Sequence, residues 1–579
     1  MEINIDAGAA PPAGKTVFGH PRGLIVLFLA EMWERFSYYG MRALLVLYLT
    51  WHFLYERDFS LTLYGAYVAL VYLGPLIGGY LADRYIGARK AVLFGALLLV
   101  GGHALMSLHG TPAKETLQAG GAVYELQRAT YDEAEHRAIV IDGQALAVTE
   151  FRQPEIGSPI RAVSFESNGA TQTLEGTIVR VRDPLYEQIL FAALALIVTG
   201  VGFLKGNISA CVGALYQEDD RRRDAGFTVY YMGINLGAFA SSLVCAWLAA
   251  EYGWAYGFGA AAIGMLFGLI VFMVGQSWLE GKADPPAEAD LKTPVFAGLN
   301  REHLVYLAGV GLFAASYGLL QVAGIMSLAM HGVFAICSAA LLAYMIIKLD
   351  RVERDRMIGL LILIMSSILF WALFDQGPSS LNLFAASHVD NSIAGWDFPA
   401  PVLQSANPLF IIIFAIPIAL LWTWLGARKQ EPNAFVKFAF AMVQIGAGFF
   451  VLNLGISMAG IDAAGNAGKV SVVFVLLMYL LHTTGELFLS PVGLSSVSKL
   501  SIKRLVGFMM GFWFFATSYA NILAAAVAQA TQVPEGAAAA DSLAAYQGVY
   551  FLLGGAATAL GVVLFVASFG LRKLLHGVQ

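Results

Sequence analysis

Long apolar runs constrain this chain more than any other feature of its sequence. Runs of roughly 18 residues or more recur along its whole length, and each can cross a bilayer core of about 30 Å. Only 13% of its 579 residues are charged, whereas soluble globular proteins carry about 25%. The sequence therefore predicts an all-α polytopic membrane protein, and it excludes a soluble enzyme, a secreted disulfide scaffold and a disordered chain.

The apolar runs predict fourteen spans in groups of six, two and six. They lie near 22–50, 60–82, 88–108, 187–216, 226–249, 254–276, 303–322, 326–348, 357–377, 404–426, 434–456, 470–492, 506–530 and 547–571. We expect two six-helix bundles with two extra helices between them. The predicted organisation is a tail at 1–21, a first bundle at 22–276, a linker at 277–300, two additional helices at 301–349, a second bundle at 350–571 and a tail at 572–579.

The distribution of Lys and Arg predicts the orientation. If the spans alternate, most basic loop residues fall on one side, and the opposite loops 378–403, 457–469 and 531–546 hold a single one, Lys469. Because short cytoplasmic loops carry the excess of Lys and Arg, both termini and the linker are expected in the cytoplasm.

Residues 109–185 form a polar insertion on the outer side. They are rich in Glu and Asp, and they contain several strand and turn signals. These signals are Ala138–Ile141, Ala162–Phe165, Thr177–Val181, Asp142-Gly143 and Asn168-Gly169. The segment therefore predicts a small extracytoplasmic β subdomain, whose role the sequence leaves open.

The first span carries four ionisable residues, Glu31, Glu34, Arg35 and Arg42. Each such residue at mid-bilayer costs about 2.5–3.5 kcal/mol on insertion scales. Glu31 and Arg35 are spaced i, i+4 and share a helix face, and Tyr38 adds a phenol one turn further along. This stripe must face protein or a wet cavity. One interpretation is a static cluster of salt bridges between helices.

Polar groups in both halves of the chain favour a different interpretation. They are Lys205, Asn235, Asp375, Asn407 and Glu486. A static cluster does not need ionisable groups in both halves, whereas a central polar cavity between two bundles does. Glycines and prolines gather beside the charges, at Gly200, Gly202, Gly206, Gly377-Pro378, Gly485, Pro491 and Gly493. Close helix packing and interrupted helices remain alternatives for them.

Other site chemistries find no support in the sequence. The histidines show no metal-ligand spacing, and no nucleophile–base pair suggests catalysis. The net charge is −5 and the basic residues lie in short loops, which argues against a nucleic-acid partner.

Several segments resemble the proton-dependent oligopeptide transporter (POT or PTR) family of the major facilitator superfamily. Glu31 to Gly40 reproduces the first-helix motif ExxERFxYYG in full. The other matching segments are Gly79 to Arg89 in a loop, Phe227 to Gly237, Phe370 to Gln376 and Gly485 to Pro491. The resemblance covers nearly the whole chain except 109–185, and the pair at 303–348 is similar to two additional helices of bacterial members. It implies the major facilitator fold.

The resemblance also implies a function, namely import of di- and tripeptides with protons by rocking of two bundles around a central site. It implies Arg35, Arg42 and Lys205 for the peptide carboxylate, Glu486 for its amino terminus, Asn235 and Asn407 for its backbone, and Tyr38, Tyr72, Trp371, Trp513 and Ser490 for the rest of the binding site. For proton coupling it implies Glu31, Glu34, Arg35 and a Lys205–Asp375 pair, and for a gating loop Asp83 and Arg84.

The charge pattern agrees with this division, because a zwitterionic peptide needs a cationic and an anionic end. The first bundle is expected to supply all the buried bases and the second acids alone. The coupling ion is the proton, with no other cofactor and no metal. A monomer in a bacterial cytoplasmic membrane suffices for the mechanism.

Asp375 departs from the family pattern, which usually has Glu at this position. Its side chain is shorter by about one C–C bond. We therefore expect a bridging water in place of a direct bond to Lys205 or Arg42.

Three other functions remain open as alternatives. They are transport of another small anion or metabolite, a non-transporting peptide receptor with 109–185 as its sensing domain, and a membrane-embedded enzyme, the weakest of the three. Uptake of ligand separates a transporter from a receptor.

Overall fold

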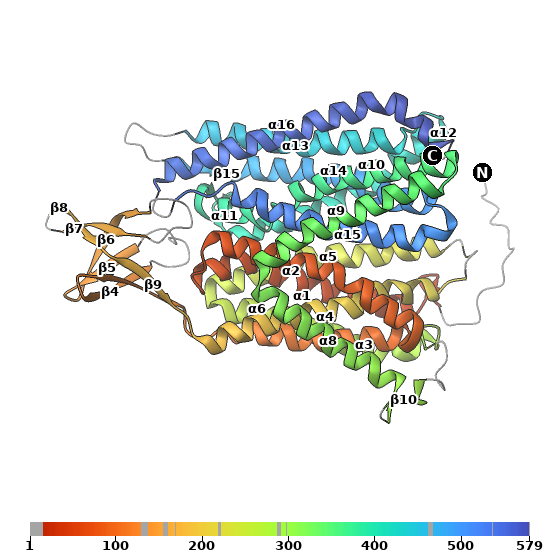
Figure 1. Cartoon of the computed structure of the whole chain (residues 1–579), viewed down its shortest axis with the longest axis horizontal. Coiled ribbons are helices and arrows are strands. Elements are labelled where there is room, and N and C mark those ends of the chain that lie inside the picture. Colours follow the sequence, from red (N-terminus) through yellow and green to blue (C-terminus); the bar gives the residue numbers. More distant parts are fainter. Residues whose placement is uncertain are drawn as a thin grey trace.

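The computed structural model describes residues 16–128, 137–153, 160–167, 169–217, 220, 222–285, 291–296, 298–460, 467–534 and 537–577. Fourteen membrane-length helices form two bundles and a hairpin between them in sequence (Figure 1). The first bundle is α1 (Gly23–Trp51), α2 (Arg57–Leu81), α3 (Gly87–Met106), α4 (Pro184–Ala214), α5 (Arg223–Tyr252) and α6 (Trp254–Gly275). The hairpin is α8 (Arg301–Gln321) and α9 (Ala323–Lys348). The second bundle is α10 (Arg351–Phe374), α12 (Ala406–Ala427), α13 (Ala434–Ala459), α14 (Val472–Leu500), α15 (Val506–Gln529) and α16 (Ala539–Leu571).

The predicted order of six, two and six spans is confirmed. Within the described ranges, twelve helical segments are long and apolar enough to cross a membrane. One of them, Arg57–Met106, contains both α2 and α3, and the charged helix α1 is not among the twelve. The short elements are β1 (Thr16–Val17), β2 (His20–Pro21), β10 (Pro294–Phe296), β11 (Leu299–Asn300), α11 (Ser380–His388), β12 (Val389–Asp390), β13 (Ser392–Ile393), β14 (Trp396–Asp397) and β15 (Val470–Ser471).

Short polar side chains determine where several helices begin. Asp183, Asn300, Asp350 and Asn433 each cap the helix that follows, because the side-chain oxygen accepts a hydrogen bond from a backbone N–H of the first turn. Pro184 adds a favourable first residue to α4. These caps fix the starts of α4, α8, α10 and α13.

The glycines and prolines beside the predicted charges have two different roles. Gly377 and Pro378 lie between α10 and α11 and interrupt the helical path, as expected. In contrast, α4 and α14 run unbroken, so the interrupted-helix alternative is wrong for both. A Cβ on Gly202 would lie 3.1 Å from backbone atoms of Gly74. The glycine therefore permits close contact between α4 and α2.

The insertion folds as a seven-stranded antiparallel sheet in the order β8-β7-β6-β5-β4-β3-β9. Its strands are β3 (Lys114–Ala119), β4 (Ala122–Arg128), β5 (Arg137–Ile141), β6 (Gln144–Arg152), β7 (Ala162–Ser167), β8 (Ala170–Glu175) and β9 (Thr177–Val181). Asp142 and Gly143 both have positive φ between β5 and β6, as a tight hairpin requires. The predicted β subdomain is confirmed, and Asn168 lies outside the described residues.

The sheet and the chain termini lie at opposite ends of the helical body (Figure 1). We call these the sheet end and the terminal end. Hydrogen bonds join the two bundles toward the sheet end. The amide of Asn382 in α11 donates to the Ala43 carbonyl of α1 over 2.9 Å. The hydroxyl of Ser518 in α15 donates to the Ala69 carbonyl of α2, also over 2.9 Å.

Side chains in the terminal-end half of the first bundle are exposed. The exposed fraction is 57% for Tyr80 of α2 and 42% for Tyr231 of α5. Tyr231 lies within the electrostatic influence of Glu486 in the second bundle, so it faces the space between the bundles. In this conformation the bundles are joined toward the sheet end, and the surface that the first bundle turns to the second is accessible from the terminal end.

Candidate functional site

Glu31, Glu34 and Arg35 form a buried cluster on α1. The Arg35 Nε lies 2.8 Å from Glu31 Oε1 and 2.5 Å from Glu34 Oε2. The three side chains are almost fully buried. The predicted i, i+4 pairing of Glu31 and Arg35 is therefore present.

This cluster is not internally satisfied. Glu34 Oε1, Arg35 Nη2 and the Tyr38 hydroxyl are buried without a hydrogen-bond partner among the described residues. Buried polar atoms are rarely left unbonded in folded proteins, and each such atom asks for an explanation. A static salt-bridge cluster offers none, whereas a site that receives additional donors and acceptors does.

Lys205 of α4 lies within the electrostatic influence of the same cluster. Its ammonium nitrogen lies 4.1 Å from the centre of the Tyr72 ring, which is a cation–π contact. No carboxylate among the described residues lies within 4.0 Å of it. The structure therefore does not form the expected Lys205–Asp375 pair in this conformation.

Asp375 instead pairs directly with Arg42. The Arg42 Nη2 lies 2.7 Å from Asp375 Oδ1, and Arg42 Nε donates to the Tyr64 hydroxyl over 2.6 Å. The expectation of a bridging water is wrong for this conformation. Asp375 terminates α10 as its C-cap residue, so it stands at a helix end beside α1. There the long side chain of Arg42 reaches Asp375, although Asp is shorter than the Glu that is usual at this position.

Glu486 of α14 forms the centre of the site in the second bundle. The Asn407 amide donates to Glu486 Oε2 over 2.9 Å and is 3.1 Å from the Thr483 hydroxyl. The Thr483 hydroxyl in turn donates to the Tyr479 carbonyl over 2.7 Å. Because the Thr483 hydroxyl proton is used in this bond, the Thr483 oxygen accepts a hydrogen bond from the Asn407 amide. The structure thus brings Asn407 and Glu486 together, as expected.

Asn235 faces the same region from α5. Its amide donates to the Tyr231 carbonyl of its own helix over 3.0 Å. Because that bond uses one of its two amide protons, the side-chain carbonyl of Asn235 can still accept a bond from a further partner. The structure places it on the first bundle, opposite the α12–α14 pair that carries Asn407 and Glu486.

The predicted aromatic residues lie around these polar groups. Tyr38 contacts the Arg35 guanidinium, with its ring centre 5.8 Å from the Arg35 Cζ. Trp371 of α10 keeps a buried indole N–H without a partner among the described residues. Trp513 of α15 packs against Gly493 of α14, where a Cβ would overlap its ring. Ser490 is half-buried in α14.

Asp83 and Arg84 lie elsewhere, in an exposed π-helical turn (Ala82–Ile86) at the terminal end. Arg84 Nη1 donates to the Tyr80 hydroxyl over 3.0 Å. The adjoining residue Arg89 bonds to Asp284 after α6. The predicted gating loop is thus an element of the terminal end, and it does not touch the charged cluster.

Sequence reasoning missed Tyr64, Thr483 and Lys437. Lys437 of α13 is buried and lies 2.5 Å from Glu431, with the Trp422 ring centre 4.6 Å away. The expectation that the first bundle supplies all the buried bases is therefore wrong. Lys437 lies in the first turn of its helix, and this position could have indicated a base near the membrane surface. The hydroxyls of Tyr64 and Thr483 carried no signal beyond their polarity.

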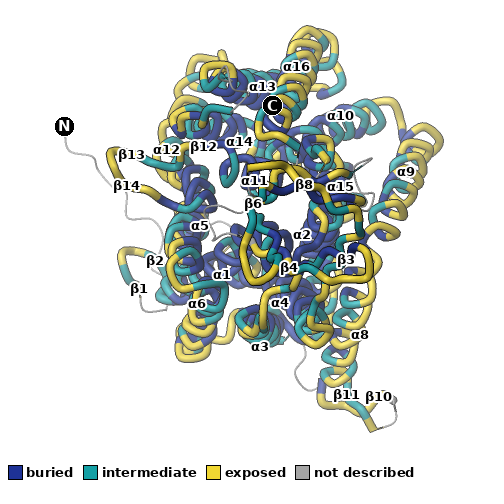
Figure 2. Tube along the Cα trace, turned by 90° about the vertical axis from the view of Figure 1, so that its left-hand side faces the viewer, coloured by how far each residue is buried: buried dark blue, intermediate teal, exposed yellow. Residues whose placement is uncertain are grey.

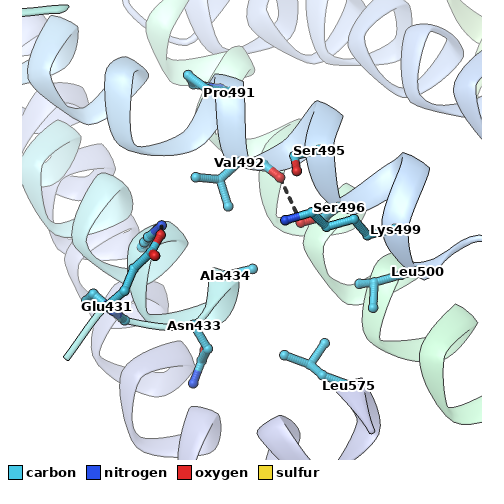
Figure 3. Close-up of a pocket in the computed structure, with 12 residues that line it drawn as sticks. Glu431, Asn433, Ala434, Pro491, Val492, Ser495, Ser496, Lys499, Leu500 and Leu575 are labelled. Carbon is cyan, nitrogen blue, oxygen red and sulfur yellow. Dashed lines mark hydrogen bonds and ion pairs between the residues drawn. The ribbon is translucent and has the colours of Figure 1, made fainter. Parts of the chain in front are cut away.

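A separate cavity of about 230 Å³ opens beside Lys437 at the terminal end of the second bundle (Figure 3). Lys499 points into it from the last turns of α14, opposite Glu431. None of the predicted site residues lines this cavity. No group of three His, Cys, Asp or Glu side chains that could hold a metal ion occurs among the described residues.

The site places its bases on the first bundle and opposes them with acids from the second. Arg35, Arg42 and Lys205 stand on the first bundle, where Glu31 and Glu34 pair with Arg35, and Asp375 and Glu486 stand on the second. One ion pair, Arg42–Asp375, closes this arrangement toward the sheet end. Such a site can hold a small ligand that carries both a negative and a positive group.

Comparison with known proteins gives a consistent result. A sequence model of the POT family matches residues 89–546. A protein named dipeptide and tripeptide permease A, from Erwinia pyrifoliae, is 30% identical over 570 residues, which cover 98% of this chain and 97% of the relative. The peptide transporter YePEPT of Yersinia enterocolitica is 30% identical over 583 residues, with 98% of each chain covered.

Solved structures show the same likeness. A crystal structure of a peptide transporter POT in complex with alafosfalin superimposes with a TM-score of 0.73 at 29% identity and covers 97% of both chains. A POT family transporter in complex with a thioalcohol-conjugated peptide gives a TM-score of 0.70 at 26% identity, with 96% of this chain and 97% of that chain covered.

Proposed function

This chain belongs to the POT family, and we propose that it is a symporter that imports di- and tripeptides together with protons. Its fold is the major facilitator fold of that family, with two six-helix bundles and an additional hairpin. Peptide transport is supported by relatives named as peptide permeases over nearly their full length. Proton coupling is our inference from the buried carboxylates and their partners.

The observation that carries the proposal is the opposition of charges across the two bundles. A peptide is a zwitterion, with a carboxylate at one end and an ammonium group at the other. Arg35, Arg42 and Lys205 offer donors for the carboxylate, and Glu486 offers an acceptor for the ammonium group. Asn407 remains beside Glu486 for the peptide backbone. Because these contacts involve groups that every peptide shares, they tolerate many side chains.

Exchange of partners at Arg42 supplies a route to proton coupling. In this conformation Asp375 holds Arg42. A peptide carboxylate that reaches Arg42 competes with Asp375 for the guanidinium. The carboxylate of Asp375, once displaced from Arg42 by the peptide, is free to accept a proton. The Arg42–Asp375 contact between the bundles is then released. Substrate, proton and conformation are thus linked through one ion pair. Glu31 and Glu34 can couple in the same way. A peptide carboxylate that binds Arg35 or Lys205 competes with them for these bases, and they can then accept a proton.

The proposed location is a bacterial cytoplasmic membrane, with both termini in the cytoplasm and the protein working as a monomer. The excess of basic residues in the loops of one side supports this orientation. The position of the sheet opposite the termini agrees with it (Figure 1). In this orientation the conformation described is open toward the cytoplasm.

A transporter of another anion and a peptide receptor are the competing functions. Glu486 is hydrogen-bonded to Asn407 and belongs to the proposed binding site. Its carboxylate favours a ligand with a positive group over a simple anion. A receptor does not need polar contacts that must break for the bundles to separate.

Counterflow in proteoliposomes tests the proposal. Vesicles loaded with unlabelled dialanine should accumulate external labelled dialanine, and excess nitrate should not compete. A receptor would bind dialanine without exchange. Exchange of nitrate but not of dialanine would indicate an anion transporter.

A further inference from the structure

The hairpin of α8 and α9 is firmly attached to the first bundle. The Lys90 ammonium of α3 lies 2.9 Å from both carboxylate oxygens of Glu302 at the start of α8. Further along, a Cβ on Gly309 of α8 would lie 2.8 Å from the Phe94 ring of α3 and 3.4 Å from the Phe203 ring of α4, and α8 packs along α4. An ion pair and close packing together make α8 a part of the first bundle.

The second helix of the hairpin lies beside α10, which follows it in the chain, and it contacts α15 through Phe334 and His331. Phe334 of α9 stacks on Tyr519 of α15, with ring centres 4.2 Å apart and planes 5° from parallel. The Tyr519 hydroxyl lies 3.0 Å from His331 Nδ1, one turn earlier in α9. Phe515 of α15 lies against the same Phe334 ring, with centres 5.4 Å apart. We call Phe334, His331 and Tyr519 the hairpin joint.

The joint lies at a place where α15 is held from two sides. Ser518, the residue before Tyr519, donates its hydrogen bond to the Ala69 carbonyl of α2 in the first bundle. Two consecutive residues of α15 therefore contact α2 and the hairpin at one level. In Figure 2 α9 lies beside α15, and α8 packs against α4 of the first bundle, so that the hairpin reaches from one bundle to the other.

We propose that the hairpin moves with the first bundle and that the hairpin joint is made in this conformation and opens when the bundles rock. Ring stacking depends on separation and offset, and a rotation of α15 relative to α9 changes both. The joint therefore stabilises the conformation that is open at the terminal end. This inference rests on the proposed function only for the rocking of the bundles.

Cross-linking distinguishes a joint that opens from a permanent contact. Phe334→Cys with Tyr519→Cys would be joined by a flexible bis-thiol reagent in a Cys337→Ser background. The matched control joins α8 to α4, through Tyr317→Cys and Gln188→Cys, whose native side chains are hydrogen-bonded. Spin labels on the exposed residues Gln217 and Lys503 report the separation of the bundles at the terminal end by pulsed electron resonance.

The link across the joint should confine the label distances to the terminal-end-open population, and cleavage of the link should restore the full distribution. The control link should leave the distribution unchanged. The proposal is overturned if the joint link leaves the distribution unchanged, or if both links alter it equally. Because the readout is conformational, failure of peptide uptake would count against the proposed function and not against the joint.

A weakened joint gives a second test without cross-linking. Phe334→Ala should lower the ratio of terminal-end-open to closed molecules by about two- to tenfold, as expected for loss of an aromatic pair. Ile336→Ala, at a position of α9 that is 70% exposed, should leave the ratio unchanged. Equal ratios in the two variants would contradict the proposal.

Discussion

Arg42 and Asp375 join the two bundles directly, with 2.7 Å between Nη2 and Oδ1, although they lie 333 residues apart in the chain. The same guanidinium donates to Tyr64 through its Nε. The pair is nearly buried, since the exposed fraction is 7% for Arg42 and 6% for Asp375. Loss of one partner of a buried ion pair leaves the other uncompensated, so the contact must be exchanged for another one when it breaks.

Asp375→Asn should separate transport from its driving force. The amide keeps the size of the side chain but neither pairs with Arg42 as a charge nor takes up a proton. We expect uptake against a gradient to be abolished in proteoliposomes, with peptide exchange partly retained. Asp375→Glu, which restores a carboxylate, serves as the matched control. Full uphill transport by Asp375→Asn would show that this carboxylate does not couple.

Thr483→Val should weaken peptide binding by about three- to tenfold, the typical net effect of one hydrogen bond. The hydroxyl accepts from Asn407, and it therefore keeps the amide of Asn407 directed at Glu486. Thr483→Ser retains the hydroxyl and should bind dialanine as the parent does. Calorimetric titration measures the three affinities. If Thr483→Val and Thr483→Ser bind dialanine equally well, the hydroxyl does not position Asn407.

Much of the fold could be predicted from the sequence, because lipid imposes a length and a polarity on each span. The apolar runs located fourteen helices, and Asp142-Gly143 located a hairpin turn. The motif at Glu31 to Gly40 placed the charged cluster on α1. These signals are local, since they depend on neighbours along one helix or one turn.

The pairing of charges between helices could not be predicted in the same way. From the sequence, either Lys205 or Arg42 could be the partner of Asp375. Which of the two pairs with it depends on where α10 ends and on the conformation of the bundles. Lys205 contacts the Tyr72 ring instead. The buried base Lys437 escaped notice because its partner Glu431 lies in a loop that the sequence did not single out.

Arg182→Ala should destabilise the sheet end of the first bundle by about 1–3 kcal/mol, the cost of leaving bonded carbonyls without their charged donor. Arg182 donates to the Phe53 and Leu54 carbonyls and stacks on Tyr55, with its Cζ 4.2 Å from the ring centre. The melting temperature in detergent measures the effect. Arg161→Ala, at an exposed position of the sheet, should melt as the parent does. Equal melting of both variants would contradict the anchoring role.

The stability of the protein should fall as the pH is lowered from about 6.5 to about 4. Burial lowers the pKa of His52, just beyond α1, to about 4, whereas a free histidine has a pKa of about 6.5. Between these values the unfolded chain binds a proton that the folded chain does not, so stability increases with pH in this window.

His52→Gln should flatten this dependence. The Gln amide can replace the bond that His52 Nε2 donates to the His109 carbonyl over 2.8 Å, but it does not titrate. Melting temperatures of the parent and the variant between pH 4 and 7 measure the difference. Parallel curves would show that another group governs the acid sensitivity.

Uptake driven by a proton gradient tests the central claim most directly. Purified protein in liposomes with an inward proton gradient would be offered labelled dialanine. We predict accumulation above equilibrium that collapses with an uncoupler and is absent in Glu486→Gln, whose side chain keeps the size of the acid but not its charge. Accumulation that persists with the uncoupler would contradict proton coupling. Equal accumulation by Glu486→Gln would contradict the site, and no uptake of any di- or tripeptide by folded protein would contradict peptide import.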